Sequence, residues 1–178
     1  MWGVERFVLS TVAYLPREEV YEFLLDFPGY AAYSKHLRAV DQRGDGGAGT
    51  EYRLRFAWWK LTYTAHSRVT EIAEPERINW KVTKDIDAAG RWEVESVEPP
   101  EGEDHATEVR FVVEYDPDTV HAGILDLPML VSMDWVVDKV VKLIREEGER
   151  VVERVVEDLE GESRPVEVSV NYSSTDSP

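Results

Sequence analysis

The stretch that decides the fold is residues 128–160, PMLVSMDWVVDKVVKLIREEGERVVERVVEDLE. Its apolar residues recur every three or four positions and most charged residues fall off this stripe, which predicts an amphipathic helix. The stripe comprises Val137, Val141, Ile144, Val151, Val155 and Leu159. At about 1.5 Å per residue such a helix is roughly 45–50 Å long, enough to cross a whole sheet. Gly161 marks its predicted end.

The first forty residues predict a strand followed by two short helices. Residues 4–14 are rich in β-branched and aromatic side chains and predict a strand. Pro16 suits the first turn of a helix, in which Val20, Phe23, Leu24 and Phe27 then recur at helical spacing. Pro28-Gly29 is expected to stop this helix, and a second short helix is expected over residues 30–34.

Six further strands are predicted between the two helical regions. In residues 50–58 the alternation is clear, because Tyr52, Leu54, Phe56 and Trp58 share one face. Strands joined by short turns form an antiparallel meander. The predicted strands are residues 37–43, 50–58, 61–72, 77–84, 90–97 and 106–115.

These elements predict an α+β domain with the order β-α-α-β6-α over residues 1–161. A curved antiparallel sheet would wrap around the long C-terminal helix, and such a layout leaves a cavity between sheet and helix. Residues 162–178 form a polar tail. The alternation of Val166, Val168 and Val170 makes an edge strand in this tail possible.

Composition narrows the class of protein. The net charge of −16 argues against nucleic acid and anionic membranes as main partners, because phosphate binding relies on clustered Lys and Arg. Carboxylates in excess, with few Lys, support the hypothesis of a cell with molar internal salt, where the Debye length is about 3 Å; an ordinary acidic protein is the alternative. The absence of Cys excludes disulfides and thiolate metal sites. With no secretory signal and no apolar run long enough for stable membrane insertion, we expect a cytoplasmic protein, and the oligomeric state stays open.

Two spaced motifs carry a family resemblance. They are Pro16-x3-Val20-Tyr21-x4-Asp26-x3-Tyr30-x2-Tyr33 and Ser67-Arg68-Val69-x5-Pro75-x2-Ile78-x-Trp80, and Trp92 and the long helix agree with them. Over residues 4–160 the chain resembles the START/Bet v 1-like helix-grip superfamily (SRPBCC), within it the polyketide cyclase/dehydrase and lipid transport group, with coenzyme Q-binding proteins nearest. The resemblance implies a cavity for an apolar or polycyclic ligand such as a lipid, isoprenoid quinone or polyketide. It transfers no catalytic residue and implies no cofactor.

The candidate site consists of aromatic residues that such a fold would direct toward one interior, with two methionines at the start of the long helix as flexible gap-fillers near an entrance. The predicted ligand-binding residues are Tyr30, Tyr33, Phe56, Trp58, Trp80, Trp92, Phe111, Met129 and Met133. The four histidines lack the spacing of a metal site, and no nucleophile elbow or phosphate loop is present.

Three functions remain open at this point. The first is the binding or carriage of a hydrophobic small molecule without catalysis. The second is an enzyme of the cyclase or dehydratase type, in which a polar pocket residue transfers a proton. The third is a protein-interaction module.

Overall fold

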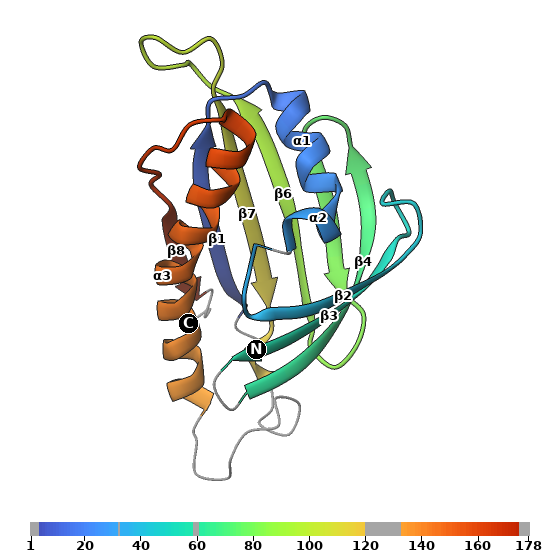
Figure 1. Cartoon of the computed structure of the whole chain (residues 1–178). Coiled ribbons are helices and arrows are strands. Elements are labelled where there is room, and N and C mark those ends of the chain that lie inside the picture. The colour runs from blue at the N-terminus through green and yellow to red at the C-terminus, as the bar shows by residue number, and fades with distance from the viewer. Residues whose placement is uncertain (1–3, 32, 59–60, 120–132, 175–178) are drawn as a thin grey trace.

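The computed structural model describes residues 4–31, 33–58, 61–119 and 133–174. Within them, eight strands form one antiparallel sheet in the order β2-β3-β4-β5-β6-β7-β1-β8 (Figure 1). The N-terminal strand therefore closes the meander by pairing with β7, and the chain's last strand pairs with the first. The strands are β1 (Glu5–Ala13), β2 (Leu37–Arg43), β3 (Glu51–Trp58), β4 (Leu61–Ala73), β5 (Arg77–Val82), β6 (Ala88–Ser96), β7 (Thr107–Tyr115) and β8 (Ser169–Ser174).

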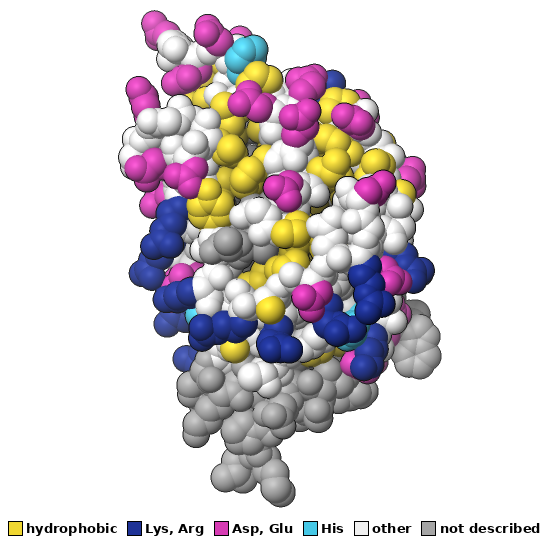
Figure 2. Space-filling model, turned by 45° about the vertical axis from the view of Figure 1, so that its right-hand side comes forward, with side chains coloured by type: hydrophobic (Ala, Val, Ile, Leu, Met, Phe, Trp, Pro, Cys, Tyr) yellow, Lys and Arg dark blue, Asp and Glu magenta, His cyan; other side chains and the backbone are white. Residues whose placement is uncertain are grey.

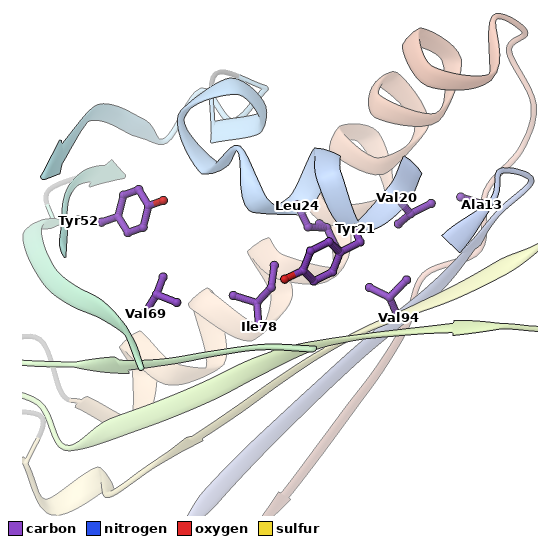
Figure 3. Packing of buried hydrophobic residues seen from close by; sticks show 8 residues of the cluster. All are labelled: Ala13, Val20, Tyr21, Leu24, Tyr52, Val69, Ile78 and Val94. Carbon is purple, nitrogen blue, oxygen red and sulfur yellow. The ribbon is translucent and has the colours of Figure 1, made fainter. Parts of the chain in front are cut away.

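The helices lie on one side of the sheet, which curves around them (Figures 1 and 3). They are α1 (Arg17–Leu25), α2 (Phe27–Ala31) and α3 (Met133–Glu160), and a short 3-10 turn, η1 (Pro117–Thr119), follows β7. The predicted order of a strand, two short helices, six strands and a long helix is confirmed. Predicted strand ends differ from the observed ends by a residue or two, and residues 128–132 of the predicted helix lie outside the described part.

The boundary between the first two helices was predicted wrongly. α1 ends at Leu25, because Asp26 leaves the helical conformation with φ −84° and ψ 69°. Pro28 does not stop a helix; it lies in the first turn of α2, where its missing N–H costs nothing. Gly29 leaves room there for the Asp26 side chain, because a Cβ would lie 2.7 Å from Asp26 Oδ2 and the carboxylate would have to move. The break therefore precedes Pro28-Gly29, and the second helix begins three residues before the predicted Tyr30.

A polar cluster joins the C-terminal end of α3 to the end of β1. The Glu160 carboxylate accepts hydrogen bonds from the Tyr14 N–H at 2.8 Å and from both Nε and Nη2 of Arg164, at 2.8 and 2.9 Å. Arg164 also donates to the Val12 carbonyl at 2.8 Å and lies 3.8 Å from the centre of the Tyr14 ring. Glu160 is thus held by charge-assisted bonds on both oxygens. This cluster sets where the long helix ends relative to the sheet.

α1 fills one end of the concave face. Its buried residues Val20, Tyr21 and Leu24 pack against the inner side of the sheet, in a cluster that Figure 3 shows. The sheet and its neighbours contribute Ala13, Tyr52, Val69, Ile78 and Val94. Burial of an aliphatic or aromatic side chain stabilises a fold by about 1.5–3 kcal/mol, so this cluster fixes α1 firmly. The rest of the concave face is free of α1.

The tail after Gly161 contributes β8, which pairs antiparallel with β1 at the edge of the sheet. The register places Tyr172 opposite Phe7, and their rings lie 4.8 Å apart. The Tyr172 hydroxyl donates a hydrogen bond to Glu5 on the same strand pair. The strand begins at Ser169, three residues after the start of the valine alternation in the sequence.

Candidate functional site

A cavity of about 350 Å³ lies between the inner face of the sheet and the α1–α2 segment. This volume falls within the range of small-molecule sites. Its described lining is almost wholly apolar. The residues are Leu24, Leu25, Phe27, Leu37, Gly46, Tyr52, Leu54, Phe56, Ala65, Ser67, Val69, Ile78, Trp80, Val82, Trp92 and Phe111.

Strand register explains why these residues face one space. Directly opposite residues of an antiparallel pair share a face, so a row of lining residues follows from each pairing. The pairs are Leu37–Phe56, Leu54–Ala65, Tyr52–Ser67, Ser67–Val82, Val69–Trp80, Ile78–Trp92 and Trp92–Phe111. In this set β4 contributes Val69 and the smaller Ala65 and Ser67, and these two stand between larger residues of β3 and β5. The floor of the cavity is therefore low at β4, and this is one source of its volume.

One wall of the cavity is a group of three rings. Phe111 stacks on Trp80 with ring centres 5.7 Å apart and planes 19° apart, and it meets Trp92 at 4.3 Å and 43°. Gly90 allows this arrangement, because a Cβ there would lie only 2.4 Å from Trp80 Cζ2. The indole of Trp80 thus lies across a glycine and presents a flat surface to the cavity.

The polar groups in the described lining belong to Tyr52, Ser67 and the indoles. Tyr52 is 7% exposed, and its ring centre lies 5.3 Å from that of Phe27. Burial raises the pKa of the Tyr52 hydroxyl, and the carboxylates of Asp26 and Asp45 raise it further. Tyr52 is therefore a neutral phenol at physiological pH. No Asp, Glu, His, Lys or Arg belongs to the described lining.

The structure brings together four of the predicted ligand-binding residues: Phe56, Trp80, Trp92 and Phe111 line the cavity. Tyr33 and Trp58 are not among the described lining residues; the Tyr33 hydroxyl donates instead to Asp158 of α3. Met129 lies outside the described residues. So do the side chains of Tyr30 and Met133, whose backbones belong to α2 and α3. A role in binding stays a prediction for the whole set.

Sequence reasoning missed Tyr52 and the aliphatic and small residues of the lining. A signal for two of them was present, since Tyr52 and Leu54 alternate with the polar residues of β3 on the same face as Phe56. Leu24, Leu25 and Phe27 come from the α1–α2 junction, which was assigned the wrong helix end. No described side chain of α3 is among the lining residues of the cavity. The predicted cavity between the sheet and this helix therefore stays a prediction, which concerns α3 side chains that the structure does not describe.

The surroundings of the site show a mixed charge pattern. Figure 2 shows hydrophobic side chains along the middle of one face, acidic side chains above them and a band of Lys and Arg below. Arg53 and Arg55 are exposed on the outer face of β3, as their alternation predicts, and Arg68 binds Glu51 at 2.6 Å. Within the described ranges, His, Asp and Glu form no cluster of three or more that could hold a metal ion. None of the described helices has the length and apolarity needed to cross a membrane.

Comparison with known proteins agrees with this architecture. The family model described as polyketide cyclase / dehydrase and lipid transport matches residues 4–160. The crystal structure of TTHA0849 from Thermus thermophilus has a TM-score of 0.59 at 20% identity, covering 88% of this chain and 97% of that one. The crystal structure of Ara h 8.0201 has a TM-score of 0.56 at 12% identity, covering 87% and 99%. No curated protein matches the chain. The two solved structures show the fold alone, and with the family model they confirm the predicted one.

Proposed function

Because the chain belongs to the polyketide cyclase / dehydrase and lipid transport family, we propose that it binds a hydrophobic small molecule in the cavity under α1 and α2. The observation that carries this proposal is a space of about 350 Å³ whose described lining is aliphatic and aromatic. We infer a ligand of lipid, isoprenoid quinone or polyketide type.

The driving force is the removal of apolar surface from water. Each 100 Å² of ligand surface buried contributes about 2.5 kcal/mol, and loss of translational and rotational freedom opposes this by about 4 kcal/mol or more. A ligand must therefore bury a few hundred Å², which suits a molecule that fills most of the cavity. The ring wall of Trp80, Phe111 and Trp92 supports a ligand with a flat portion, because offset aromatic contacts add to simple burial.

Binding without chemistry is the reading that the lining supports. General acid–base catalysis needs a group with a pKa near the working pH, within hydrogen-bond reach of the reacting atom. The described lining holds no carboxylate, imidazole or amine. Tyr52 has its pKa raised, first by burial, and so is a poor proton acceptor at neutral pH. A carrier or sensor needs none of these groups.

Native mass spectrometry of protein purified at high salt, followed by organic extraction, tests the proposal. We expect an apolar molecule to co-purify. In addition, a long-chain fatty acid, an isoprenoid quinone and a polycyclic aromatic probe should be titrated while Trp fluorescence is followed, since Trp80 and Trp92 line the cavity.

Two matched variants make the test specific to this cavity. Ala65→Phe places a ring in the floor of the cavity, whereas Ala89→Phe places the same ring on the exposed outer position of β6. Ala65→Phe should lower affinity for the bound probe at least tenfold, and Ala89→Phe should leave it unchanged. Equal affinities in the two variants, or no binding to the parent protein, would contradict the proposal.

A further inference from the structure

Two neighbouring side chains of the apolar cavity carry hydroxyl groups. Tyr52 on β3 and Ser67 on β4 are directly opposite in the strand register, and both line the cavity. Opposite side chains on one face have Cβ atoms about 4.5–5.5 Å apart, so both side chains enter the same part of the cavity. The Ser67 hydroxyl stays close to the sheet, and the longer Tyr52 side chain carries its hydroxyl above it. Their strand neighbours on the same face are apolar: Leu54, Ala65, Val69 and Val82.

Neither hydroxyl oxygen is among the buried polar atoms that lack a partner in the described part of the chain. Tyr52 is more than nine-tenths buried, and its hydroxyl points across the concave face toward α1 (Figure 3). The contact with Phe27 holds its ring in this direction. Both oxygens are therefore open to water in the cavity, and Ser67 as a whole is only half-buried. A polar atom of a ligand can replace this water.

The acid–base state of Tyr52 determines which atom this is. Burial, and then Asp26 and Asp45, raise the pKa of its hydroxyl, so the proton stays on oxygen at neutral pH. A protonated phenol is primarily a hydrogen-bond donor, and a serine hydroxyl can donate alongside it. A carbonyl oxygen has two lone pairs, so it can accept a hydrogen bond from each of the two hydroxyls.

We propose that Tyr52 and Ser67 form a polar subsite that binds the carbonyl oxygen of an otherwise apolar, planar ligand. This deepens the proposed function and rests on it. The carbonyl end of the ligand lies at β3 and β4, and its ring system extends toward Trp80 on β5. Two strand spacings separate β3 from β5, roughly 10 Å, which suits two or three fused rings.

A matched pair of probes tests the subsite. 9-Fluorenone and fluorene share one planar tricyclic frame, and only the first carries a carbonyl oxygen. We expect the parent protein to bind fluorenone roughly three- to tenfold more tightly than fluorene, the usual range for one or two net hydrogen bonds. Tyr52→Phe and Ser67→Ala should each reduce this preference, and the double variant should abolish it. The readout is the ratio of the two affinities in each variant, because both residues line the cavity and a substitution can also change the affinity for fluorene itself.

A control and a second readout separate the subsite from general packing. Tyr172→Phe removes a hydroxyl from the edge strand β8, where it bonds Glu5, and should leave the preference intact. The infrared carbonyl stretch of bound fluorenone should lie at lower frequency in the parent protein than in Tyr52→Phe, because hydrogen bonding weakens the bond. If Tyr52→Phe does not fold, Ser67→Ala alone must still reduce the preference.

The outcomes distinguish the two proposals. If both probes bind equally well to the parent protein, or the carbonyl stretch is unaffected by either substitution, the subsite is wrong and hydrophobic binding stands. If neither probe binds the parent protein, cavity binding of planar ligands fails, and the subsite fails with it.

Discussion

Replacing Gly90 by alanine places a methyl group in space that Trp80 and the β7 backbone already occupy. The added Cβ would lie 2.4 Å from Trp80 Cζ2 and 2.4 Å from the Val112 carbonyl oxygen. Ordinary contact begins at 3.4 Å, so the indole must retreat by about 1 Å into the cavity. The carbonyl belongs to the neighbouring strand and cannot move without disturbing the β6–β7 ladder.

The expected cost follows from this double clash. Overpacking a well-packed core costs about 1–3 kcal/mol, and a clash with both a ring and a backbone oxygen places Gly90→Ala near the upper value. For a domain of this size 1 kcal/mol shifts Tm by about 2–4 °C, so we expect Tm to fall by roughly 6–12 °C. Because the indole moves into the cavity, affinity for a planar ligand should fall as well.

Thermal denaturation followed by circular dichroism measures this effect. Gly148→Ala is the matched control, since nothing lies within 4 Å of its added Cβ and Gly148 lies inside α3. That change should stabilise the protein by about 0.5–1 kcal/mol through helix propensity. Trp80→Phe combined with Gly90→Ala should recover part of the lost stability, because the smaller ring removes one of the two clashes. An unchanged Tm in Gly90→Ala would refute this account of the ring wall.

Three other changes test separate parts of the structure. Glu160→Gln should lower the free energy of unfolding by about 1–3 kcal/mol at pH 7, because it removes the charged acceptor of Arg164 and Tyr14. Burial alone would raise the pKa of Glu160, but the bonds from Arg164 and Tyr14 lower it overall. The stabilisation is therefore fully present above pH 4.5 and is lost as the pH falls through the lowered pKa, so urea denaturation should show a smaller difference between Glu160→Gln and the parent protein at pH 3 than at pH 7. Thr107→Val should cost about 1–3 kcal/mol in urea denaturation, since Thr107 is 1% exposed and its hydroxyl donates to the Leu15 carbonyl at 2.7 Å; the exposed Thr62→Val should change stability by less than about 0.5 kcal/mol. Tyr33→Phe should speed amide exchange in the last turns of α3 with little effect on global stability, because its bond to Asp158 is exposed; unchanged exchange would show that this bond does not hold the helix.

Periodicity was sufficient for the architecture, because each element is long enough to show its period. The strand of residues 106–115 and the helix up to Glu160 both alternate or repeat over several cycles, and both were located to within a residue of these observed ends. The α1–α2 junction failed for the opposite reason. The dipeptide Pro28-Gly29 is typical of a helix end, but Pro is also favoured in the first turn of a helix. The backbone conformation of Asp26, which ends α1, shows that Pro28 belongs to the first turn of α2.

The site was predicted in part, and the reason lies in what was searched for. Large rings with a polar edge stand out in a sequence, and Phe56, Trp80, Trp92 and Phe111 do face the cavity. A cavity also depends on residues that occupy little space, such as Ala65 and Ser67. An alanine or a serine in a strand carries no signal of its own, since the same residue on the outer face has no such role. Their contribution becomes visible only when register places them opposite larger neighbours.

The shape of the cavity therefore depends as much on small residues as on large ones. Ala65 and Ser67 are small, so the cavity is deeper at β4. Gly90 of β6 leaves room for the indole of Trp80, which lies on the neighbouring strand β5. α1 fills the end of the concave face beyond Leu24. Replacing any of these small residues by a larger one should reduce ligand binding. Replacing an aromatic lining residue by a smaller side chain should enlarge the cavity and change which ligand fits. Specificity in this protein would then be altered most readily at β4 and at Gly90, because there a single methyl group changes the available volume without altering the charge of the site.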